Sequence, residues 1–301
     1  MWAKRLITLF ILTLVVAACG REAPPHLRSL SSAVISQLAL KGMRADTPIF
    51  IRVFKEESEL EVWKPKNDGY YHLFKTYQIC KWSGKLGPKL KTGDKQAPEG
   101  FYNVSNRQMN PSSKYHLSFN LGFPNAFDRA HRRTGSHLMI HGNCKSKGCY
   151  AMTDALVEEI YLLARDAFIG GQKSFPVHAF PFRMNTRNME RYRNHKWIGF
   201  WETLKEGYDQ FELTRKPPSV SVCGKNYLIN ASFIHPRRRV HPRRPCPPYR
   251  KIQHAIYLGK PKVRNTSSTG ILLEDASTLL EKFRTSVNDI QTLPDDEIQA
   301  D

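Results

Sequence analysis

The sequence is poor in acidic residues. It has 27 Asp and Glu against 46 Lys and Arg, which gives a formal net charge of +19 at pH 7. Such a balance first suggests nucleic acid as a partner, but the sequence lacks any recognisable nucleic-acid-binding motif. We therefore expect no nucleic-acid partner. The positive charge would instead favour other polyanions, such as anionic lipid head groups or polymers that carry carboxylates.

Long hydrophobic runs are also scarce. The clearest one covers residues 6–18, directly after a basic start, and ends in V-A-A before Cys19. It is short for a helix that crosses a bilayer and has the layout of a secretory signal. The last residues have the form of a bacterial lipobox, so we expect cleavage before Cys19 and a lipid on its thiol. An ordinary signal peptide or a signal anchor is the alternative.

The sequence offers too few ligands for a structural zinc site. Cys144, Cys149 and His141 lie close together, but no second Cys/His pair follows at a spacing that would complete a tetrahedron. We therefore expect no metal and no organic cofactor.

Cysteine is rare as well, with six residues in 301. If Cys19 is lipidated and Cys149 stays reduced, an even number remains for an oxidising compartment: Cys80, Cys144, Cys223 and Cys246. One or two disulfides are expected, and the sequence does not choose among the three possible pairings. A Cys144–Cys149 disulfide is a further alternative, and it would block the Cys149 thiol.

The most informative stretch covers residues 136–154, S-H-L-M-I-H-G-N-C-K-S-K-G-C-Y-A-M-T-D. Its apolar run predicts a buried strand that ends at His141, and Cys149 is expected just before a helix. A thiol is nucleophilic as thiolate and needs a neighbouring base, which His141 could supply. The start of the helix would add amide donors and a favourable dipole. Gly148 would let the backbone approach a substrate closely.

This stretch resembles the signature of the L,D-transpeptidase (YkuD) family, in which an H-G pair is followed by S-H-G-C around the catalytic cysteine. The shorter gap, Cys144 within it, and Y-A-M-T-D after Cys149 resemble the YafK-type branch of that family. The resemblance extends over roughly residues 45–230 and includes segments 82–102, 116–130, 175–184 and 217–224.

The resemblance implies a mixed α/β fold that is mainly β, with a β-sandwich or barrel catalytic core and peripheral helices. The period-two patterns at 49–54, 60–63 and 71–80 favour the same architecture. We expect a lipoprotein signal peptide at 1–18, a lipid-attached tether and short amphipathic helix at 19–44, a catalytic domain at 45–230, and a basic Pro/Arg-rich, partly disordered extension at 231–301.

Local patterns predict the elements around the motif. A helix should begin with Asp154 as its N-cap and end near Gly170, whereas 125–133 should be irregular. Helical sequence is expected again over 189–206. Residues 83–100 should form a long loop that supports the site, and residues 234–251 should be extended or disordered because they are rich in arginine and proline.

The resemblance also implies a mechanism. The Cys149 thiolate would attack an amide carbonyl of a peptidoglycan stem peptide, with His141 as general base and then acid. Backbone N–H groups around Gly148 and Cys149 would hold the oxyanion. The Gly142 carbonyl would orient the imidazole, and Ser146 would shape the loop. A further expectation is that Arg129 binds a substrate carboxylate.

Two departures from the family signature bear on the outcome of the reaction. Lys147 replaces the histidine of S-H-G-C, and Ala151 replaces an arginine two residues after the nucleophile. We therefore favour hydrolysis, an amidase activity that includes cleavage of a wall-linked lipoprotein from peptidoglycan. The alternative is transpeptidation that forms cross-links or attaches a lipoprotein. A non-catalytic, lipid-anchored peptidoglycan-binding protein is the further alternative. The expected location is the periplasm, as a lipoprotein anchored to the outer membrane.

Overall fold

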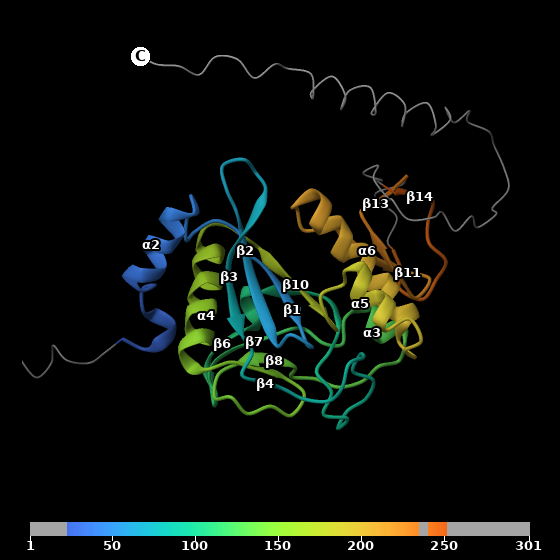
Figure 1. Cartoon of the computed structure of the whole chain (residues 1–301), viewed down its shortest axis with the longest axis horizontal. Coiled ribbons are helices and arrows are strands. Elements are labelled where there is room, and N and C mark those ends of the chain that lie inside the picture. Colours follow the sequence, from blue (N-terminus) through green and yellow to red (C-terminus); the bar gives the residue numbers. More distant parts are fainter. Residues whose placement is uncertain (1–22, 235–239, 252–301) are drawn as a thin grey trace, which may run out of the picture. The chain divides into compact units, whose positions relative to one another are not determined.

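The computed structural model describes residues 23–234 and 240–251 (Figure 1). All of them belong to one of the chain's two compact units, Met1–Gln253. Cys19, the signal segment and residues 252–301 of the C-terminal extension lie outside the described residues. No helix in the described part is both long and apolar enough to cross a membrane.

The first of two five-stranded sheets contains the strands that the period-two patterns predict. Its order is β3 (Tyr71–Gln78), β2 (Glu59–Pro65), β1 (Phe50–Phe54), β10 (Ser174–Phe180) and β5 (Gly100–Ser105). β1 and β10 are parallel, and the other neighbours are antiparallel. β1 is buried along its whole length, which explains why its sequence is almost continuously apolar.

The second sheet carries the H-G…C stretch. Its order is β4 (Lys81–Trp82), β9 (Tyr150–Ala151), β8 (Met139–His141), β7 (His116–Asn120) and β6 (Met109–Ser113). β8 and β9 are parallel, although only a short loop separates them in the chain. The mainly β, sandwich-like core that the sequence predicts is confirmed.

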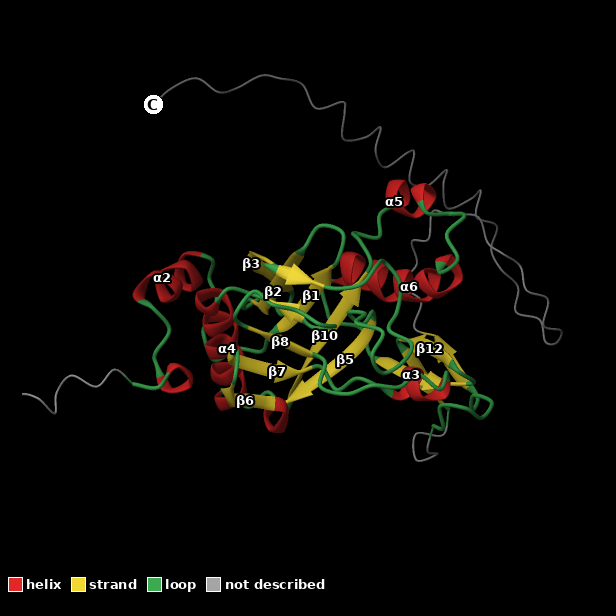
Figure 2. Cartoon of the chain, turned by 90° about the horizontal axis from the view of Figure 1, so that it is seen from below, coloured by secondary structure: helices red, strands yellow, loops and turns green. Residues whose placement is uncertain are grey.

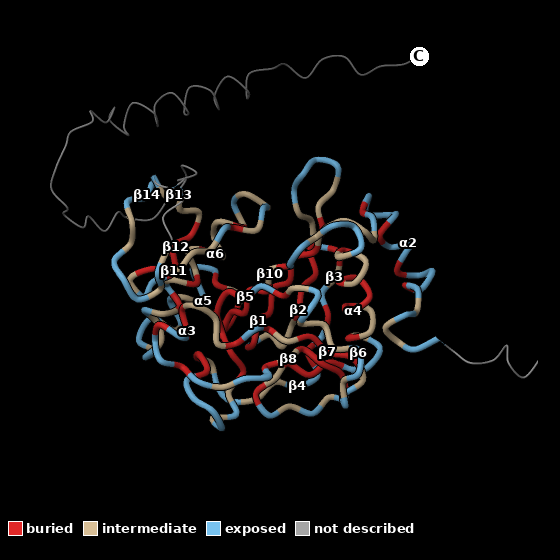
Figure 3. The backbone as a smooth tube through the Cα atoms, turned by 180° about the vertical axis from the view of Figure 1, so that it is seen from behind, coloured by how far each residue is buried: buried red, intermediate tan, exposed pale blue. Residues whose placement is uncertain are grey.

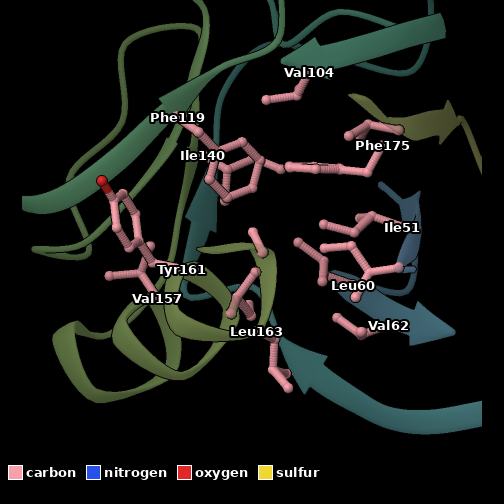
Figure 4. Packing of buried hydrophobic residues seen from close by; sticks show 14 of the residues in the cluster. Ile51, Leu60, Val62, Val104, Phe119, Ile140, Val157, Tyr161, Leu163 and Phe175 are labelled. Atoms are coloured by element: carbon pink, nitrogen blue, oxygen red, sulfur yellow. The ribbon is translucent and has the colours of Figure 1, made fainter. Parts of the chain in front are cut away.

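The main hydrophobic core lies between the two sheets and helix α4 (Asp154–Ile169). Figure 4 shows its packing, with side chains from both sheets and from α4: Ile51, Leu60, Val62, Val104, Phe119, Ile140, Val157, Tyr161, Leu163 and Phe175. In Figure 3 the central strands are buried while the outer loops are exposed. A buried side chain of this size contributes about 1.5–3 kcal/mol relative to exposure, so this core fixes the sheet that holds the site.

Helix α4 begins differently from the prediction. Thr153, not Asp154, is the N-cap, and its side chain accepts a hydrogen bond from the Leu156 amide. The helix therefore starts five residues after Cys149, because Tyr150 and Ala151 are extended and pair with β8. Its C-terminal end at Gly170 agrees with the predicted stop.

The segment 125–133 is not irregular, as the sequence led us to expect. It contains the short helix α3 (Ala126–Ala130), which a capping box between Asn125 and Asp128 closes at its N-terminus. Asp128 is fully buried and pairs with Arg133. The basic composition concealed a helix that depends on this reciprocal cap.

The remaining helices cover the periphery of the sheets (Figure 2). They are η1 (Pro25–Leu27), α2 (Ser32–Leu40), η2 (Asn106–Gln108), α5 (Thr186–Arg191) and α6 (Ile198–Thr214). In α2, Val34 and Leu38 are buried in the main core while Ile35 is 45% exposed. The short amphipathic helix that the sequence predicts is therefore confirmed as α2, and its apolar face packs on the main core.

Part of the basic extension is ordered. Within it, β13 (Ala231–Phe233) pairs with β14 (Tyr249–Lys251). The hairpin of β11 (Val220–Cys223) and β12 (Asn226–Ile229) precedes it, at the end of the predicted catalytic domain. A Cys223–Cys246 disulfide joins the two regions. This covalent link holds residues 240–251, which are irregular up to the short strand β14, in agreement with the extended alternative of the prediction.

Candidate active site

The parallel strands β8 and β9 bring His141 and Cys149 to one face of the second sheet. Ile140 is paired with Tyr150, and His141 with Ala151. Because side chains alternate along a strand, Ile140 and Tyr150 point into the core. His141, Ala151 and Cys149 share the opposite face, with Cys149 diagonally across from the histidine.

His141 is held in one orientation by its own neighbour in the chain. Its Nδ1 lies 2.6 Å from the Gly142 carbonyl oxygen. A carbonyl can only accept a hydrogen bond, so Nδ1 carries the proton and Nε2 is left as an acceptor. Burial lowers the pKa of His141, and the Gly142 hydrogen bond opposes this shift in part. The residue is therefore a neutral base at pH 7.

Gly142 occupies a place where no side chain fits. A Cβ at this position would overlap Asp154 Oδ1 and lie 2.9 Å from the Tyr115 carbonyl oxygen. Asp154 Oδ1 accepts a hydrogen bond from the Asn143 amide at 2.7 Å. Instead of capping the helix, this carboxylate anchors the loop that follows His141.

Cys149 is a free, half-buried thiol. The Met139 amide donates to its Sγ at 3.4 Å, and the thiol donates to the His137 carbonyl at 3.6 Å. Burial raises the pKa of Cys149, while the Met139 amide and the charge of Lys89 lower it. Together with neutral His141, this describes a neutral thiol and a neutral imidazole at rest rather than a preformed ion pair.

The amides expected to hold the oxyanion are already engaged within the loop. The Gly148 N–H donates to Ser83 Oγ, and the Cys149 N–H donates to Ser146 Oγ at 3.1 Å. Ser146 Oγ in turn donates to the Cys149 carbonyl at 2.6 Å. Ser146 thus has the loop contacts that its predicted role requires, but neither amide is free in this conformation.

The dipole of helix α4 cannot favour the Cys149 thiolate as the sequence led us to expect. Cys149 leads into strand β9, and α4 starts only at Asp154, whereas dipole effects fall off within the first turn.

A disulfide fixes the loop between the two predicted catalytic residues. Cys144 is bonded to Cys80, at the end of β3, across 64 residues of sequence. The alternative of a Cys144–Cys149 bond is therefore wrong, and the thiol is not blocked. In the part of the chain that the structure describes, no group of three His, Cys, Asp or Glu could hold a metal ion.

The loop 83–99 contacts the Gly148 amide beside the nucleophile through Ser83 and rests on a buried ion pair. Lys55 Nζ contacts Glu99 at 2.9 Å, and both side chains are fully buried. The same ammonium donates to the carbonyls of Lys85, Gly87 and Ala97 at 2.9–3.0 Å. This arrangement clamps the loop to β1.

Two residues of the predicted supporting loop, Asp94 and Pro98, make further contacts. Asp94 pairs with Lys89, and the Tyr150 hydroxyl donates to the Pro98 carbonyl at 2.6 Å. The Pro98 contact therefore links the loop to β9, the strand that follows Cys149.

Arg129 lies away from the thiol. It lines a cavity of about 380 Å³ together with Phe101, Asn125, His178 and Tyr227, and the lining includes neither Cys149 nor His141. Its guanidinium donates to the Pro124 carbonyl. A role for Arg129 in binding a substrate carboxylate therefore stays a prediction.

Three further residues near the site lie outside the motif and could not be identified from it. Ser83 contacts the Gly148 amide, Lys89 acts on the thiol through its charge, and the Tyr115 ring lies 4.9 Å from the His141 ring. All three come from segments far upstream of the motif. Ser83 and Lys89 had a signal, since both belong to the segment 82–102 that resembles the family, whereas Tyr115 had none.

Comparisons with known proteins show which family the chain is similar to. The model of the L,D-transpeptidase catalytic domain (YkuD) matches residues 50–177. The chain is 45% identical over 225 residues to the Escherichia coli K12 protein named "Putative L,D-transpeptidase YafK", a match that covers 75% of this chain and 91% of that protein.

Two solved structures are also similar. One is the helical cell shape determining protein Pgp2 of Campylobacter jejuni, with 16% identity, 65% of this chain and 80% of that chain covered, and a TM-score of 0.36. The other is Bdellovibrio bacteriovorus Bd1075, with 24% identity, 56% and 63% covered, and a TM-score of 0.32.

Proposed function

The chain belongs to the L,D-transpeptidase (YkuD) catalytic-domain family, and from that premise we propose that it cleaves amide bonds of peptidoglycan stem peptides through a Cys149 thioester. Membership of this family supports a peptidoglycan-modifying enzyme. One observation carries the finer proposal: a free thiol and a neutral histidine share one sheet face, and the Gly142 carbonyl fixes the histidine tautomer.

The reaction follows from these groups. His141 Nε2 removes the thiol proton as Cys149 Sγ attacks the amide carbonyl carbon, which forms a C–S bond and an oxyanion. When the C–N bond breaks, protonated His141 gives its proton to the leaving amine, and the acyl group remains on sulfur. Water activated by His141 then attacks the thioester and releases a carboxylate, with the thiol regenerated.

Hydrolysis is favoured over transfer because this chain lacks the arginine that the family signature carries two residues after the nucleophile, which could bind a second substrate. Ala151 is fully buried and pairs with His141, where the family signature carries an arginine. Lys147 is exposed and keeps a positive charge without an imidazole. Transpeptidation that forms cross-links or attaches a lipoprotein is the alternative, and it shares the acyl-enzyme up to the deacylation step.

We also propose the surroundings in which the enzyme works. The sequence of the signal segment supports a periplasmic lipoprotein that is attached to the outer membrane through Cys19. Stem peptides, including those joined to a wall-linked lipoprotein, would be the substrates. Their carboxylates suit a chain with a formal net charge of +19.

Mass spectrometry of defined wall fragments tests the proposal. The full chain and its Cys149→Ala variant would be incubated with stem-peptide monomers, cross-linked dimers and lipoprotein-linked fragments. Cleavage without new cross-links, lost in the variant, is the expected result. New cross-linked products would favour the transpeptidase alternative, and turnover that survives in Cys149→Ala would overturn the cysteine mechanism. If neither protein acts but both bind the fragments, the non-catalytic binding protein is the better description.

A further inference from the structure

Ser83 directly follows β4, Cys149 directly precedes β9, and Ser83 Oγ contacts the Gly148 amide beside the nucleophile. β4 and β9 are antiparallel, with Lys81 paired to Ala151 and Trp82 to Tyr150. Continuing this register by one residue would place Ser83 opposite Cys149. Paired residues point to the same side of a sheet, so the Ser83 hydroxyl shares the face that carries Cys149 and His141.

The hydroxyl proton of Ser83 makes only one long hydrogen bond within the loop. Its Oγ accepts the Gly148 N–H. Its other neighbour is Ser146 Oγ, 3.3 Å away, and the single proton of Ser146 is committed to the Cys149 carbonyl at 2.6 Å. Ser83 must therefore be the donor in that contact, which is long for an O–H···O bond. Since Ser83 is half-buried, a substrate oxygen could take this proton's hydrogen bond instead.

The two amides beside the thiol cannot replace it in this conformation. Both N–H groups donate to serine hydroxyls. The Gly148 amide polarises Ser83 Oγ, which makes the hydroxyl a better donor through cooperative hydrogen bonding.

We propose that Ser83 is a further catalytic residue, whose hydroxyl donates a hydrogen bond to the oxyanion formed when Cys149 attacks a carbonyl. The proposal deepens the proposed function and rests on it for the identity of the natural substrate. The hydroxyl transfers no proton, because the proton that reaches the leaving group comes from His141. Its part is to stabilise the negative charge on oxygen while the C–S bond forms.

The surrounding loop holds Ser83 in place before the reaction. The Ser83 carbonyl accepts a hydrogen bond from the Ala97 N–H at 2.9 Å. The Ala97 carbonyl in turn accepts a hydrogen bond from the buried Lys55 ammonium. A donor that is fixed in advance needs no reorganisation as charge develops, which is the condition under which such donors contribute most.

The test compares two reagents that modify Cys149 by different routes. p-Nitrophenyl acetate acylates the thiol through a tetrahedral oxyanion, whereas iodoacetamide alkylates it by displacement at carbon with no oxyanion. Both rates would be measured in single-turnover experiments on the full chain. The variants are Ser83→Ala and Ser83→Thr, and Ser112→Ala provides a matched control because Ser112 is exposed on β6.

We expect Ser83→Ala to slow acylation by about 10²–10³-fold, the usual cost of removing one oxyanion donor, while alkylation changes by less than about twofold. Ser83→Thr keeps a hydroxyl and should retain acylation within about tenfold. Equal slowing of both reactions would show a merely structural role and overturn the proposal, as would unchanged acylation. Neither reagent is peptidoglycan, so the Ser83 result stands even if wall fragments prove not to be substrates.

Discussion

The carbonyl oxygen of Gly142 lies 2.6 Å from Nδ1 of His141, the residue that directly precedes it. This contact decides which imidazole nitrogen carries the proton and leaves Nε2 as the base. Many cysteine enzymes use a side-chain amide or carboxylate for this purpose, whereas here the backbone does so. The backbone can adopt this position because Gly142 has no side chain.

Gly142→Ala should therefore lower activity strongly. The added Cβ would overlap the Asp154 carboxylate and crowd the Tyr115 carbonyl, so the peptide must shift and the His141 hydrogen bond is lost. We expect a fall of about 10²-fold or more in kcat, in keeping with the usual contribution of a positioned general base. The measurement is kcat for stem-peptide cleavage, or for ester acylation of Cys149.

Gly199→Ala is the matched control for this substitution. Gly199 lies in the first turn of α6, and nothing lies within 4 Å of the Cβ that would be added. Alanine favours a helix by roughly 0.5–1 kcal/mol over glycine, so this variant should be as active as the parent and at least as stable. Full activity in Gly142→Ala would show that the carbonyl contact does not orient the base.

The pH dependence of Cys149 alkylation should show a neutral resting pair. Burial raises the pKa of Cys149 above its ordinary value, and burial lowers the pKa of His141. Iodoacetamide reacts with the thiolate, so the rate should rise about tenfold per pH unit up to at least pH 9. A plateau between pH 5 and 8 would instead reveal a thiolate–imidazolium ion pair and contradict this reading of the site.

The sequence predicted the strands better than the segments between them. Strands β1, β2 and β3 follow from period-two patterns, since each buries side chains on the main core. Helix α3 was missed because the reciprocal Asn125–Asp128 cap, not hydrophobic periodicity, stabilises it. The start of α4 was misplaced because Tyr150 and Ala151 are drawn into a sheet by pairing with β8, a tertiary contact that local propensity does not report.

In the site, too, the sequence predicted local contacts but not those that depend on the pairing of distant strands. His141, Gly142 and Ser146 could be named because their contacts are local, within three residues in sequence. Ser83 reaches Gly148 across 65 residues, and its position depends on how β4 pairs with β9. The Cys80–Cys144 disulfide likewise depends on the fold, which is why arithmetic on four cysteines left three pairings open.

The two disulfides should differ in their effect on activity. The Cys80–Cys144 bond holds the loop between His141 and Cys149, so the Cys80→Ala/Cys144→Ala variant should lose about 2–5 kcal/mol of unfolding free energy and most of its activity. A mild reductant should act in the same direction. The measurements are denaturant unfolding and the acylation rate of Cys149.

The Cys223→Ala/Cys246→Ala variant is the matched control. Its bond ties the ordered part of the extension to β11, remote in sequence from the catalytic loop. We expect it to lose stability but to keep the acylation rate within about threefold. If reductant raised activity instead, the catalytic thiol would have been held in a disulfide, contrary to the pairing with Cys80.

His178 should make the fold sensitive to acid. The side chain is buried between the rings of Phe50 and Phe101, and its Nδ1 has no hydrogen-bond partner among the described residues. Burial, together with the charge of Arg52, lowers the pKa of His178 to about 3. Because the unfolded chain binds this proton near pH 6.5, the stability that neutral His178 permits is present above about pH 6.5 and is lost as the pH falls toward 3.

His178→Phe should remove this sensitivity, because phenylalanine suits the aromatic surroundings and binds no proton. Between pH 7 and pH 4.5 the parent should lose about 2–3 kcal/mol more unfolding free energy than the variant, since each pH unit below 6.5 costs about 1.36 kcal/mol. Denaturant unfolding at both pH values measures the difference, and the carboxylates common to both proteins cancel. If both proteins lost the same unfolding free energy, His178 would take up no proton on unfolding in this pH range. The acid sensitivity would then come from the buried carboxylates alone.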